Sequence, residues 1–325
     1  MKKFLKITGI VLILAIIAIS GIGVYVKTAL PDTGPAEKIT VERTPERIER
    51  GKYLANHVAV CMDCHSKRDW TLFAGPMAVD GFGAGGEVFD QKFGFPGSFH
   101  SKNITPYALG TWSDGDILKA ITTGVSKTGK ALFPIMGYQR FGKMDREDVL
   151  SIIAYLRTLT PVASTIPESI PDFPVNFIIN TMPQKAAFTK RPAETDVTAY
   201  GAYLINVAGC VECHSKRDKG NVVAGTEFGG GMEFPCEGGI VRSPNITFDE
   251  ETGIGNWSKE GFVQRFKSFA DSNYHAARMS PGDLNTQMPW SMYAGMKRSD
   301  LEAIYTYLKT IKPIRNEVKR YEKKS

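Results

Sequence analysis

Two short runs of the chain, residues 61–65 and 210–214, contain two cysteines and an adjacent histidine in the same pattern. The pattern is Cys-x-x-Cys-His, the attachment motif of c-type haem. Both thiols form thioethers with the haem vinyl groups, and the imidazole binds the iron. Each run is followed by the same Ser-Lys-Arg-Asp, so the match is not a coincidence. We therefore expect two covalently attached haem c groups, held by Cys61, Cys64 and His65 in the first run and by Cys210, Cys213 and His214 in the second.

Other uses of paired cysteines fit the sequence less well. Structural zinc sites place their two Cys-x-x-Cys pairs about 15–20 residues apart, whereas these begin at positions 61 and 210. A thioredoxin-like redox pair follows a β-strand, but each pair here follows a helical pattern. The fifth cysteine, Cys236, is isolated, and we expect it to be a buried apolar thiol.

The iron of each haem needs a second axial ligand, for which methionine is the usual partner in cytochromes c. Met136 and Met288 occupy equivalent positions beside a proline, in a loop before a helical segment. Met144 and Met296 are also equivalent, but they lie at the start of that helical segment and are expected to pack in the core. We therefore predict Met136 and Met288 as the axial ligands. His57 and His275 have no counterparts, and His100 aligns with Arg242, so these histidines are weaker candidates.

The elements that must position these ligands occur twice, because residues from about 44 to 162 repeat from about 196 to 314. Each copy begins with a helical segment and ends with another, in which apolar residues recur at i, i+3, i+4 and i+7. Thr44, Ser113 and Ser258 are expected to cap helices. The shared landmarks are Gly-x-Tyr-Leu at 51–54 and 201–204, Asn-Ile-Thr at 103–105 and 245–247, and Trp-Ser at 112–113 and 257–258. These patterns predict an all-α fold.

The repeat also divides the chain. Residues 163–195 contain five prolines and are expected to form an extended linker over the domains. The predicted organisation is a membrane anchor at 1–30, one haem domain at 31–162, the linker, and a second haem domain at 196–325 that ends in a basic tail. Each domain is too small to form a large core alone, and a covalent haem would supply the missing apolar centre.

The N-terminal segment predicts where the protein resides. Lys2, Lys3 and Lys6 precede an uncharged run at 7–26, which is long enough to cross a bilayer as a helix. The excess of lysine before this run places the N-terminus in the cytoplasm. We expect an uncleaved anchor rather than a cleavable signal peptide, with the remaining chain on the periplasmic side of a bacterial inner membrane.

The formal net charge of +6 does not indicate a nucleic-acid partner. Four lysines in the first thirty residues account for most of it, and the haem propionates would make the exported part mildly negative. The stretch at 312–325 is locally basic. Such a tail is usually solvated, although docking to an acidic partner or to lipid headgroups is an alternative.

Taken together, these residues resemble the class I cytochrome c family. The resemblance implies two class I cytochrome c domains in tandem, in each of which the first and last helices cross at a glycine–aromatic contact. Those contacts would join Gly51 to Tyr155 and Gly201 to Tyr307. The resemblance also implies that a carbonyl of a Gly-Pro pair accepts the histidine Nδ1–H. Gly75-Pro76 matches that pair, whereas the second copy has Gly225-Thr226.

The long loops, the Asn-Ile-Thr and Trp-Ser elements and the proline-flanked methionines are more narrowly similar to the multihaem cytochrome c subunits of bacterial membrane-bound alcohol and gluconate dehydrogenases. That resemblance covers roughly residues 44–314. Those subunits typically carry three haems and a C-terminal anchor, whereas this chain has two motifs and an N-terminal anchor.

The resulting prediction is a membrane-anchored dihaem cytochrome that transfers single electrons and has no enzymatic activity of its own. Its expected partners are redox proteins: a dehydrogenase subunit, a quinol-linked complex or a terminal oxidase. The alternative is a dihaem peroxidase-type enzyme in which one haem opens to substrate. A methionine for each haem argues against that alternative, because it leaves neither iron with a vacant position.

Overall fold

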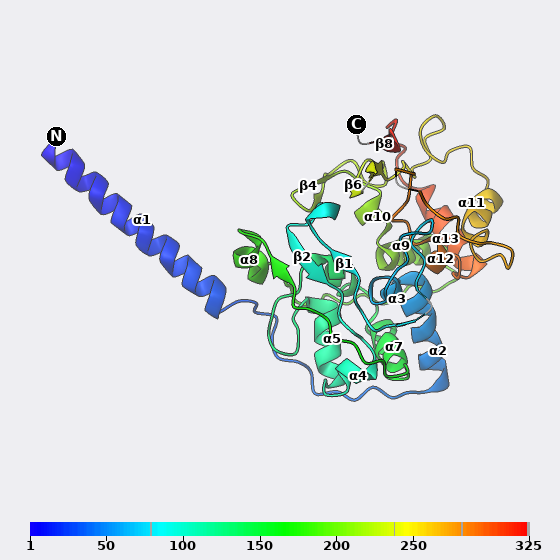
Figure 1. The fold of residues 1–325 in the computed structure, drawn as a ribbon, viewed down its shortest axis with the longest axis horizontal. Coiled ribbons are helices and arrows are strands. Elements are labelled where there is room, and N and C mark those ends of the chain that lie inside the picture. The colour runs from blue at the N-terminus through cyan, green and yellow to red at the C-terminus, as the bar shows by residue number, and fades with distance from the viewer. Residues whose placement is uncertain (79, 237, 281, 324–325) are drawn as a thin grey trace.

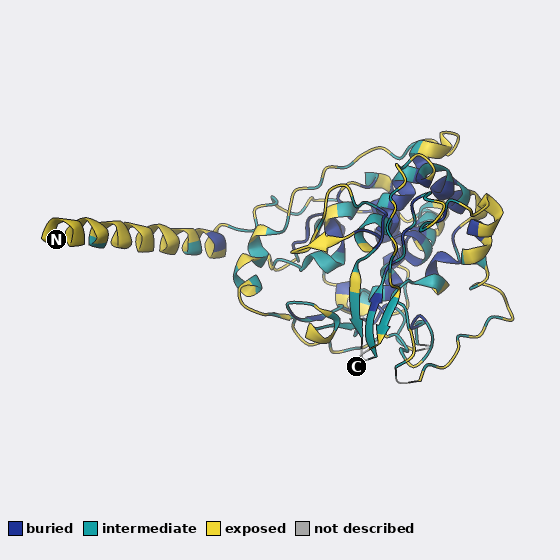
Figure 2. Ribbon diagram, turned by 90° about the horizontal axis from the view of Figure 1, so that it is seen from above, coloured by how far each residue is buried: buried dark blue, intermediate teal, exposed yellow. Residues whose placement is uncertain are grey.

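The computed structural model describes residues 1–78, 80–236, 238–280 and 282–323. One long helix, α1 (Lys2–Thr28), projects from the body of the molecule (Figure 1). Its side chains are almost all exposed (Figure 2), and the helix is long and apolar enough to cross a membrane. The predicted N-terminal apolar helix is therefore present, and the rest of the chain folds at its C-terminal end.

The first half of the body is mainly helical. Its main helices are α2 (Pro45–Tyr53), α5 (Asp114–Thr123) and α7 (Arg146–Leu156). Shorter turns lie between them: the π-helix η1 (Leu54–Val58), α3 (Cys61–Cys64), η2 (Gln91–Phe93), α4 (Pro106–Leu109), η3 (Pro134–Met136) and α6 (Tyr138–Phe141). The predicted caps are confirmed, since Thr44 accepts a hydrogen bond from the Arg47 backbone and Ser113 forms a capping box with Asp116.

The second half contains corresponding main helices in the same order. Its helices are α9 (Val197–Ala208), α10 (Cys210–Cys213), α11 (Lys259–Lys267), α12 (Trp290–Tyr293) and α13 (Arg298–Leu308). Ser258 caps α11 by accepting a hydrogen bond from the Gly261 backbone, as predicted. Helix α9 is continuous, whereas its counterpart in the first half passes from α2 into η1. The first half has one more residue between the leucine (Leu54 or Leu204) and the cysteine that follows it, and the wider π turn accommodates it.

In each half the first and last helices cross at a glycine. A Cβ on Gly51 would lie 1.8 Å from the Ser151 carbonyl oxygen, and a Cβ on Gly201 would lie 2.1 Å from the Ala303 carbonyl oxygen. The expected approach of Gly201 to Tyr307 is confirmed, because a Cβ on Gly201 would lie 3.1 Å from the Cβ of Tyr307. Gly51 instead has its closest contacts with the Ser151 backbone, one turn before Tyr155. The absence of a side chain at these two positions is what lets the helix backbones touch.

The fold also contains short strands that the all-α prediction missed. In the first half, β1 (Val88–Phe89) pairs with β2 (Gly97–His100), and β2 pairs with β3 (Ile170–Pro171). In the second half, β6 (Glu233–Cys236) pairs with β7 (Gly239–Arg242), and β7 pairs with β8 (Tyr321–Lys323). A small hairpin joins β4 (Arg217–Asp218) to β5 (Asn221–Val222). Each Gly-rich loop is thus a hairpin extended by a strand that follows the last helix of its half.

Two segments expected to be extended or solvated carry structure of their own. Residues 163–195 contain β3, the helix α8 (Val175–Ile178) and the turn η4 (Ile179–Thr181). The basic tail is not free, because its residues up to Lys323 include β8, and Glu322 is paired with Arg242 at 2.8 Å. Lys324 and Ser325 of that tail lie outside the described residues. Buried apolar side chains of both halves form one contiguous core.

Candidate haem sites

Each Cys-x-x-Cys-His run forms a single helical turn with a left-handed residue before it. Val60 precedes α3 with φ of 49°, and Gly209 precedes α10 with φ of 73°. Within each turn the histidine backbone nitrogen donates to the carbonyl of the first cysteine, at 2.9 Å in both runs. The turn therefore brings the two thiols and the imidazole into one local unit in each half.

The structure joins none of the described cysteines in a disulfide. Burial raises the pKa of Cys61 to about 11 and the pKa values of Cys64 and Cys210 to about 12. A redox-active dithiol needs a thiol with a lowered pKa, so these pairs do not have the electrostatics of a thioredoxin-like site. Among the described residues, no cluster of three or more His, Cys, Asp or Glu side chains is arranged to hold a metal ion.

Both histidines are oriented by a backbone carbonyl. His65 Nδ1 lies 2.6 Å from the Lys102 carbonyl oxygen, and His214 Nδ1 lies 2.9 Å from the Pro244 carbonyl oxygen. A carbonyl only accepts, so Nδ1 carries the proton and Nε2 has its lone pair free. Neither Nε2 has a hydrogen-bond partner within the described part of the chain. Burial lowers the pKa of both rings and keeps them neutral, and a neutral imidazole with a fixed tautomer fits an iron ligand.

The carbonyl that orients the histidine is not the predicted one. The Gly75 carbonyl instead accepts from Arg68 Nε at 2.7 Å. Lys102 and Pro244 each stand immediately before the repeated Asn-Ile-Thr. Within that motif Asn103 Oδ1 accepts hydrogen bonds from the Thr105 backbone and hydroxyl, and the second copy has the same pair of bonds. The motif fixes the loop that presents the carbonyl. Its repetition in the sequence could have indicated where the carbonyl that orients each histidine lies.

The methionines fall into two groups. Met144 is 0 % exposed and Met296 is 1 % exposed, so both are packed in the core as predicted. Met136 ends η3, and Met288 lies two residues before α12. Both are partly buried and pack against the core. The structure therefore leaves Met136 and Met288 at the edge of the core, each just before the short helix α6 or α12.

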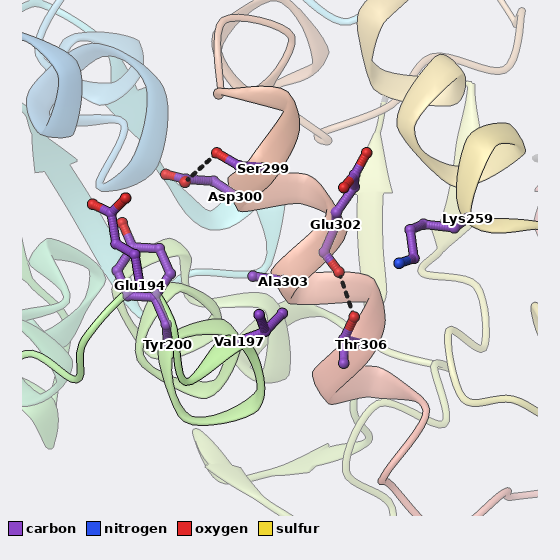
Figure 3. A pocket seen from close by; sticks show the side chains of 9 residues that line it. All are labelled: Glu194, Val197, Tyr200, Lys259, Ser299, Asp300, Glu302, Ala303 and Thr306. Carbon is purple, nitrogen blue, oxygen red and sulfur yellow. Dashed lines mark hydrogen bonds between the residues drawn. The ribbon is translucent and has the colours of Figure 1, made fainter.

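Two of the remaining histidines have other partners. His57 Nδ1 lies 3.0 Å from the Met292 carbonyl oxygen, and His100 Nε2 lies 3.1 Å from Ser98 Oγ. The cavity in Figure 3 lies beside α9 and α13, and none of the predicted ligands lines it. The candidate sites are thus confined to the two Cys-x-x-Cys-His turns and their surroundings.

Sequence reasoning missed several charged residues at these turns. Asp63, inside the first turn, forms a buried ion pair with Arg68 at 3.0 Å. Glu212, at the equivalent position of the second turn, is paired instead with Arg140 from the other half. Arg68 is part of the repeated Ser-Lys-Arg-Asp, which gave a signal for it. Arg140 had none, because its counterpart in the repeat is Met292.

The comparisons with known proteins agree with these motifs. No family model matches the chain. It is 28% identical over 305 residues to the cytochrome c subunit of alcohol dehydrogenase (quinone) from Gluconacetobacter polyoxogenes, which covers 88% of this chain and 59% of the relative. It is 28% identical over 284 residues to the gluconate 2-dehydrogenase cytochrome c subunit of Pantoea cypripedii, covering 81% of this chain and 59% of that subunit.

A third relative is a diheme cytochrome c-type protein of Cereibacter sphaeroides, 25% identical over 266 residues, with 78% of this chain and 82% of that protein covered. The chain spans a little under 60% of the length of the two dehydrogenase subunits. The resemblance to the cytochrome c subunits of alcohol and gluconate dehydrogenases that the motifs predicted is therefore confirmed.

Proposed function

We propose that this protein is a membrane-anchored dihaem c-type cytochrome that carries single electrons away from a dehydrogenase. The observation that carries the proposal is the pair of Cys-x-x-Cys-His turns, each with its histidine oriented by a backbone carbonyl and with Nε2 free. The relatives are cytochrome c subunits, which supports an electron-transfer role. Of the partners expected from the sequence, they favour the dehydrogenase subunit.

In this proposal residues 31–162 and 196–325 are two class I cytochrome c domains that arose by duplication, joined by residues 163–195. Cys61 and Cys64 would hold one haem through thioethers, and His65 and Met136 would bind its iron. Cys210, Cys213, His214 and Met288 would have the same roles for the other. Haem c bound in this way supplies one-electron exchange between Fe(II) and Fe(III).

The chain's own residues would hold these groups with little rearrangement. The Lys102 and Pro244 carbonyls fix the imidazole planes, and the buried side chains around the turns exclude water. The soft thioether of a methionine favours the reduced iron and raises its potential. Two protein ligands would leave each iron without a position for substrate, so an electron carrier is favoured over a peroxidase-type enzyme.

We further propose that α1 anchors the protein in a bacterial inner membrane, with the body on the periplasmic side. The three lysines before the apolar run support that orientation. This location fits the chemistry, because covalent c-type haem is normally assembled on that side.

The number of haems tests the proposal directly. Mass spectrometry and haem absorption should give two haems in the wild-type protein and one in each of the double variants C61S/C64S and C210S/C213S. A wild-type chain without covalent haem would contradict the proposal.

The axial ligands need a separate experiment. The oxidised protein should show the weak near-infrared band of methionine bound to Fe(III), and Met136→Ala and Met288→Ala should each remove part of it. Met144→Leu is the matched control, since Met144 is fully buried in the core, and it should keep the band. A high-spin haem in the unmodified oxidised protein, or turnover of hydrogen peroxide with an electron donor, would favour the peroxidase-type enzyme.

A further inference from the structure

The segment at 170–182 lies against the C-terminal end of α1. The Phe177 ring is 3.5 Å from the point that a Cβ on Gly23 would occupy. Asn180 Nδ2 donates a hydrogen bond to the Val26 carbonyl oxygen at 3.2 Å. Figure 1 shows α8 at the side of the body from which α1 emerges. This segment, which we call the α8 segment, is therefore fixed in position relative to α1.

Its depth follows from the length of the apolar run. Residues 7–26 would span about 30 Å at 1.5 Å per residue, which is the thickness of the hydrocarbon core of a bilayer. Gly23 and Val26 fall in the last turn of that run. A segment in contact with both must lie where the hydrocarbon gives way to the headgroups.

The surface chemistry of the α8 segment suits that depth. Phe173 is 84 % exposed, Ile170 67 % and Ile178 40 %, although all three are large and apolar. Asp172 is the one charged residue of the segment, and its carboxylate accepts a hydrogen bond from Gln91 Nε2 at 2.9 Å. Residues 173–184 contain no charged side chain. Nearby on α1, Tyr25 is 58 % exposed, as in the aromatic belts found at membrane interfaces. In water this face would expose apolar area without compensation, whereas in lipid the same area would be buried.

We propose that the α8 segment inserts into the interfacial region of the same bilayer that α1 crosses. It would be a second membrane contact, made with lipid. This rests on the proposed insertion of α1. With α1 as the single membrane contact, the body could rotate and tilt on the residues that join it to α1. A second contact fixes which face of the body points away from the membrane.

The test uses the full-length protein in phospholipid nanodiscs, with a spin label at Phe173→Cys in a Cys236→Ser background. Collision with dissolved oxygen, which concentrates in lipid, should exceed collision with a water-soluble nickel chelate. Tyr107→Cys is the matched control, because Tyr107 is 58 % exposed on α4, away from α1. At that position collision with the chelate should exceed collision with oxygen. A label at Ile13→Cys reports the insertion of α1.

The outcomes separate the two ideas. A label at residue 173 that the chelate reaches as freely as at residue 107, while residue 13 stays in lipid, overturns the second contact and leaves the anchor intact. Protection of residue 173 from both reagents would mean that protein covers the segment, and it too overturns the proposal. An exposed label at residue 13 refutes the anchor itself, and the second contact with it.

A different observation concerns Arg140, which extends from the first half to the second candidate haem site. Its Nε donates to the Val207 carbonyl oxygen at 3.2 Å, and its Nη1 donates to Glu212. A Cβ on Gly209 would lie 3.0 Å from its Cζ. Arg140 belongs to α6 in the first half, but these three partners surround Cys210 in the second half. Only 15 % of its side chain is exposed. Because a thioether would join Cys210 directly to the edge of its haem, the charge of Arg140 would lie near that haem edge.

We infer that Arg140 is a positioning residue that sets the reduction potential of the second haem site, an inference that rests on the proposed function. A fixed cation disfavours the extra positive charge of an oxidised iron, and the effect is strong where little water screens it. Removing the cation should therefore lower that potential, and removing its partner Glu212 should raise it.

Spectroelectrochemical titration of the haem-loaded protein tests this, and the C61S/C64S variant identifies the midpoint potential of the second haem. Arg140→Gln should shift that potential downward, Arg140→Lys should shift it much less, and Glu212→Gln should shift it upward. Arg157→Gln is the control, because Arg157 is similarly buried but is paired with Asp114 in the first half. It should leave the potential of the second haem near that of the wild type.

Opposite shifts in the Arg140 and Glu212 variants support the inference, because a merely structural role gives no reason for the sign to reverse. An unchanged potential of the second haem in Arg140→Gln, or an equal shift in Arg157→Gln, overturns it. If Arg140→Gln does not assemble, Glu212→Gln decides alone: an unchanged potential of the second haem overturns the inference. A chain that carries no haem at all refutes the proposed function instead.

Discussion

Asp148 receives more hydrogen bonds than a carboxylate at an ordinary helix start. It is 1 % exposed and accepts from Arg50 at 2.9 and 2.7 Å, from Arg191 at 2.6 Å and from the Tyr203 hydroxyl at 2.6 Å. Its counterpart, Asp300, accepts from the Tyr53 hydroxyl at 2.6 Å. Each aspartate thus accepts a hydrogen bond from the equivalent tyrosine of the other half, but only Asp148 also binds two arginines.

This difference predicts unequal costs of substitution. Asp148→Asn should lower the free energy of unfolding by about 3 kcal/mol, because it leaves buried guanidinium charge without a counterion. Asp300→Asn should cost about 1–2 kcal/mol, the range for a weakened hydrogen bond to a charged group. Urea unfolding of both variants measures the two values. Equal losses would show that the arginines contribute nothing beyond the tyrosine.

The same residue predicts part of the pH dependence of stability. Burial raises the pKa of Asp148, but the hydrogen bonds and charge of Arg50, aided by Tyr203 and Arg191, outweigh it, and the net pKa is lowered. A lowered folded-state pKa gives stability that is present above the unfolded value of about 3.9 and lost as pH falls through the folded value. The wild type should therefore lose stability below about pH 4, and Asp148→Asn should lose less over that range. Parallel pH profiles for the two proteins would contradict this assignment.

At this scale the sequence predicted residue types better than residue partners. The spacing of Cys61, Cys64 and His65 defines one helical turn, so their proximity follows from local geometry. The carbonyl that meets the imidazole comes from Lys102, more than thirty residues later. That partner depends on the path of a loop, which no local pattern specifies.

Among the elements, the two crossings of first and last helices are the tightest contacts. Each depends on a glycine that faces the backbone, not a flexible side chain, of the last helix. The backbone cannot move aside as a side chain would, so the helices would have to separate to admit even a methyl group.

Gly51→Ala and Gly201→Ala should therefore each lower the free energy of unfolding by about 2 kcal/mol or more, in the upper range for overpacked sites. Gly261→Ala is the control, because a Cβ there meets only the Ser258 hydroxyl, at 3.3 Å. That variant should remain within about 1 kcal/mol of the wild type, given the better helix propensity of alanine. Thermal unfolding followed by circular dichroism compares the three. Unchanged stability in both crossing variants would show that the helices repack freely.

Element prediction succeeded where the signal was local and failed where it was not. Thr44, Ser113 and Ser258 cap their helices as expected because a cap needs only the next three residues. The strands β3 and β8 each pair with a hairpin from far earlier in the chain. Two or three residues of strand leave no period-2 pattern to detect, so the all-α prediction missed them.

The whole body is held together by contacts that run in both directions between its halves. Tyr53 of the first half bonds Asp300 of the second, and Tyr203 of the second bonds Asp148 of the first. A loop contact adds to these, since the Phe73 backbone donates to the Ala277 carbonyl and the Met279 backbone donates to the Thr71 carbonyl, both at 2.8 Å. The segment that follows His65 is therefore tied to the segment that leads to Met288.

These reciprocal contacts predict one cooperative unfolding transition for the body, detected equally by circular dichroism and by haem absorption. A chain cut after residue 195 should unfold at a distinctly lower temperature and bind a hydrophobic dye, because it would expose the part of the shared core that the second half covers. Two separate transitions in the full chain, or an unchanged midpoint in the truncated one, would show that the halves fold independently.

The repeat predicted two similar halves, and the structure gives both the same order of main helices. It did not predict how they meet, because the contact residues differ between the copies: His57 has no counterpart, and Arg140 takes the place of Met292. His57 bonds the Met292 carbonyl, and Asn206 bonds the Arg140 carbonyl. Both contacts end on backbone carbonyls, which leave no trace in the residue types.

The crossed tyrosine–aspartate bonds also impose an order on assembly. In the proposed export the chain leaves the membrane from α1 onward, so residues 31–162 emerge well before α13. Until α13 arrives, Tyr53 has no aspartate to bond and His57 has no carbonyl, because both partners lie between residues 292 and 300. The first half therefore lacks two of its contacts until the second half has been made. Docking of the second half onto the first is then a late step in the folding of the exported body.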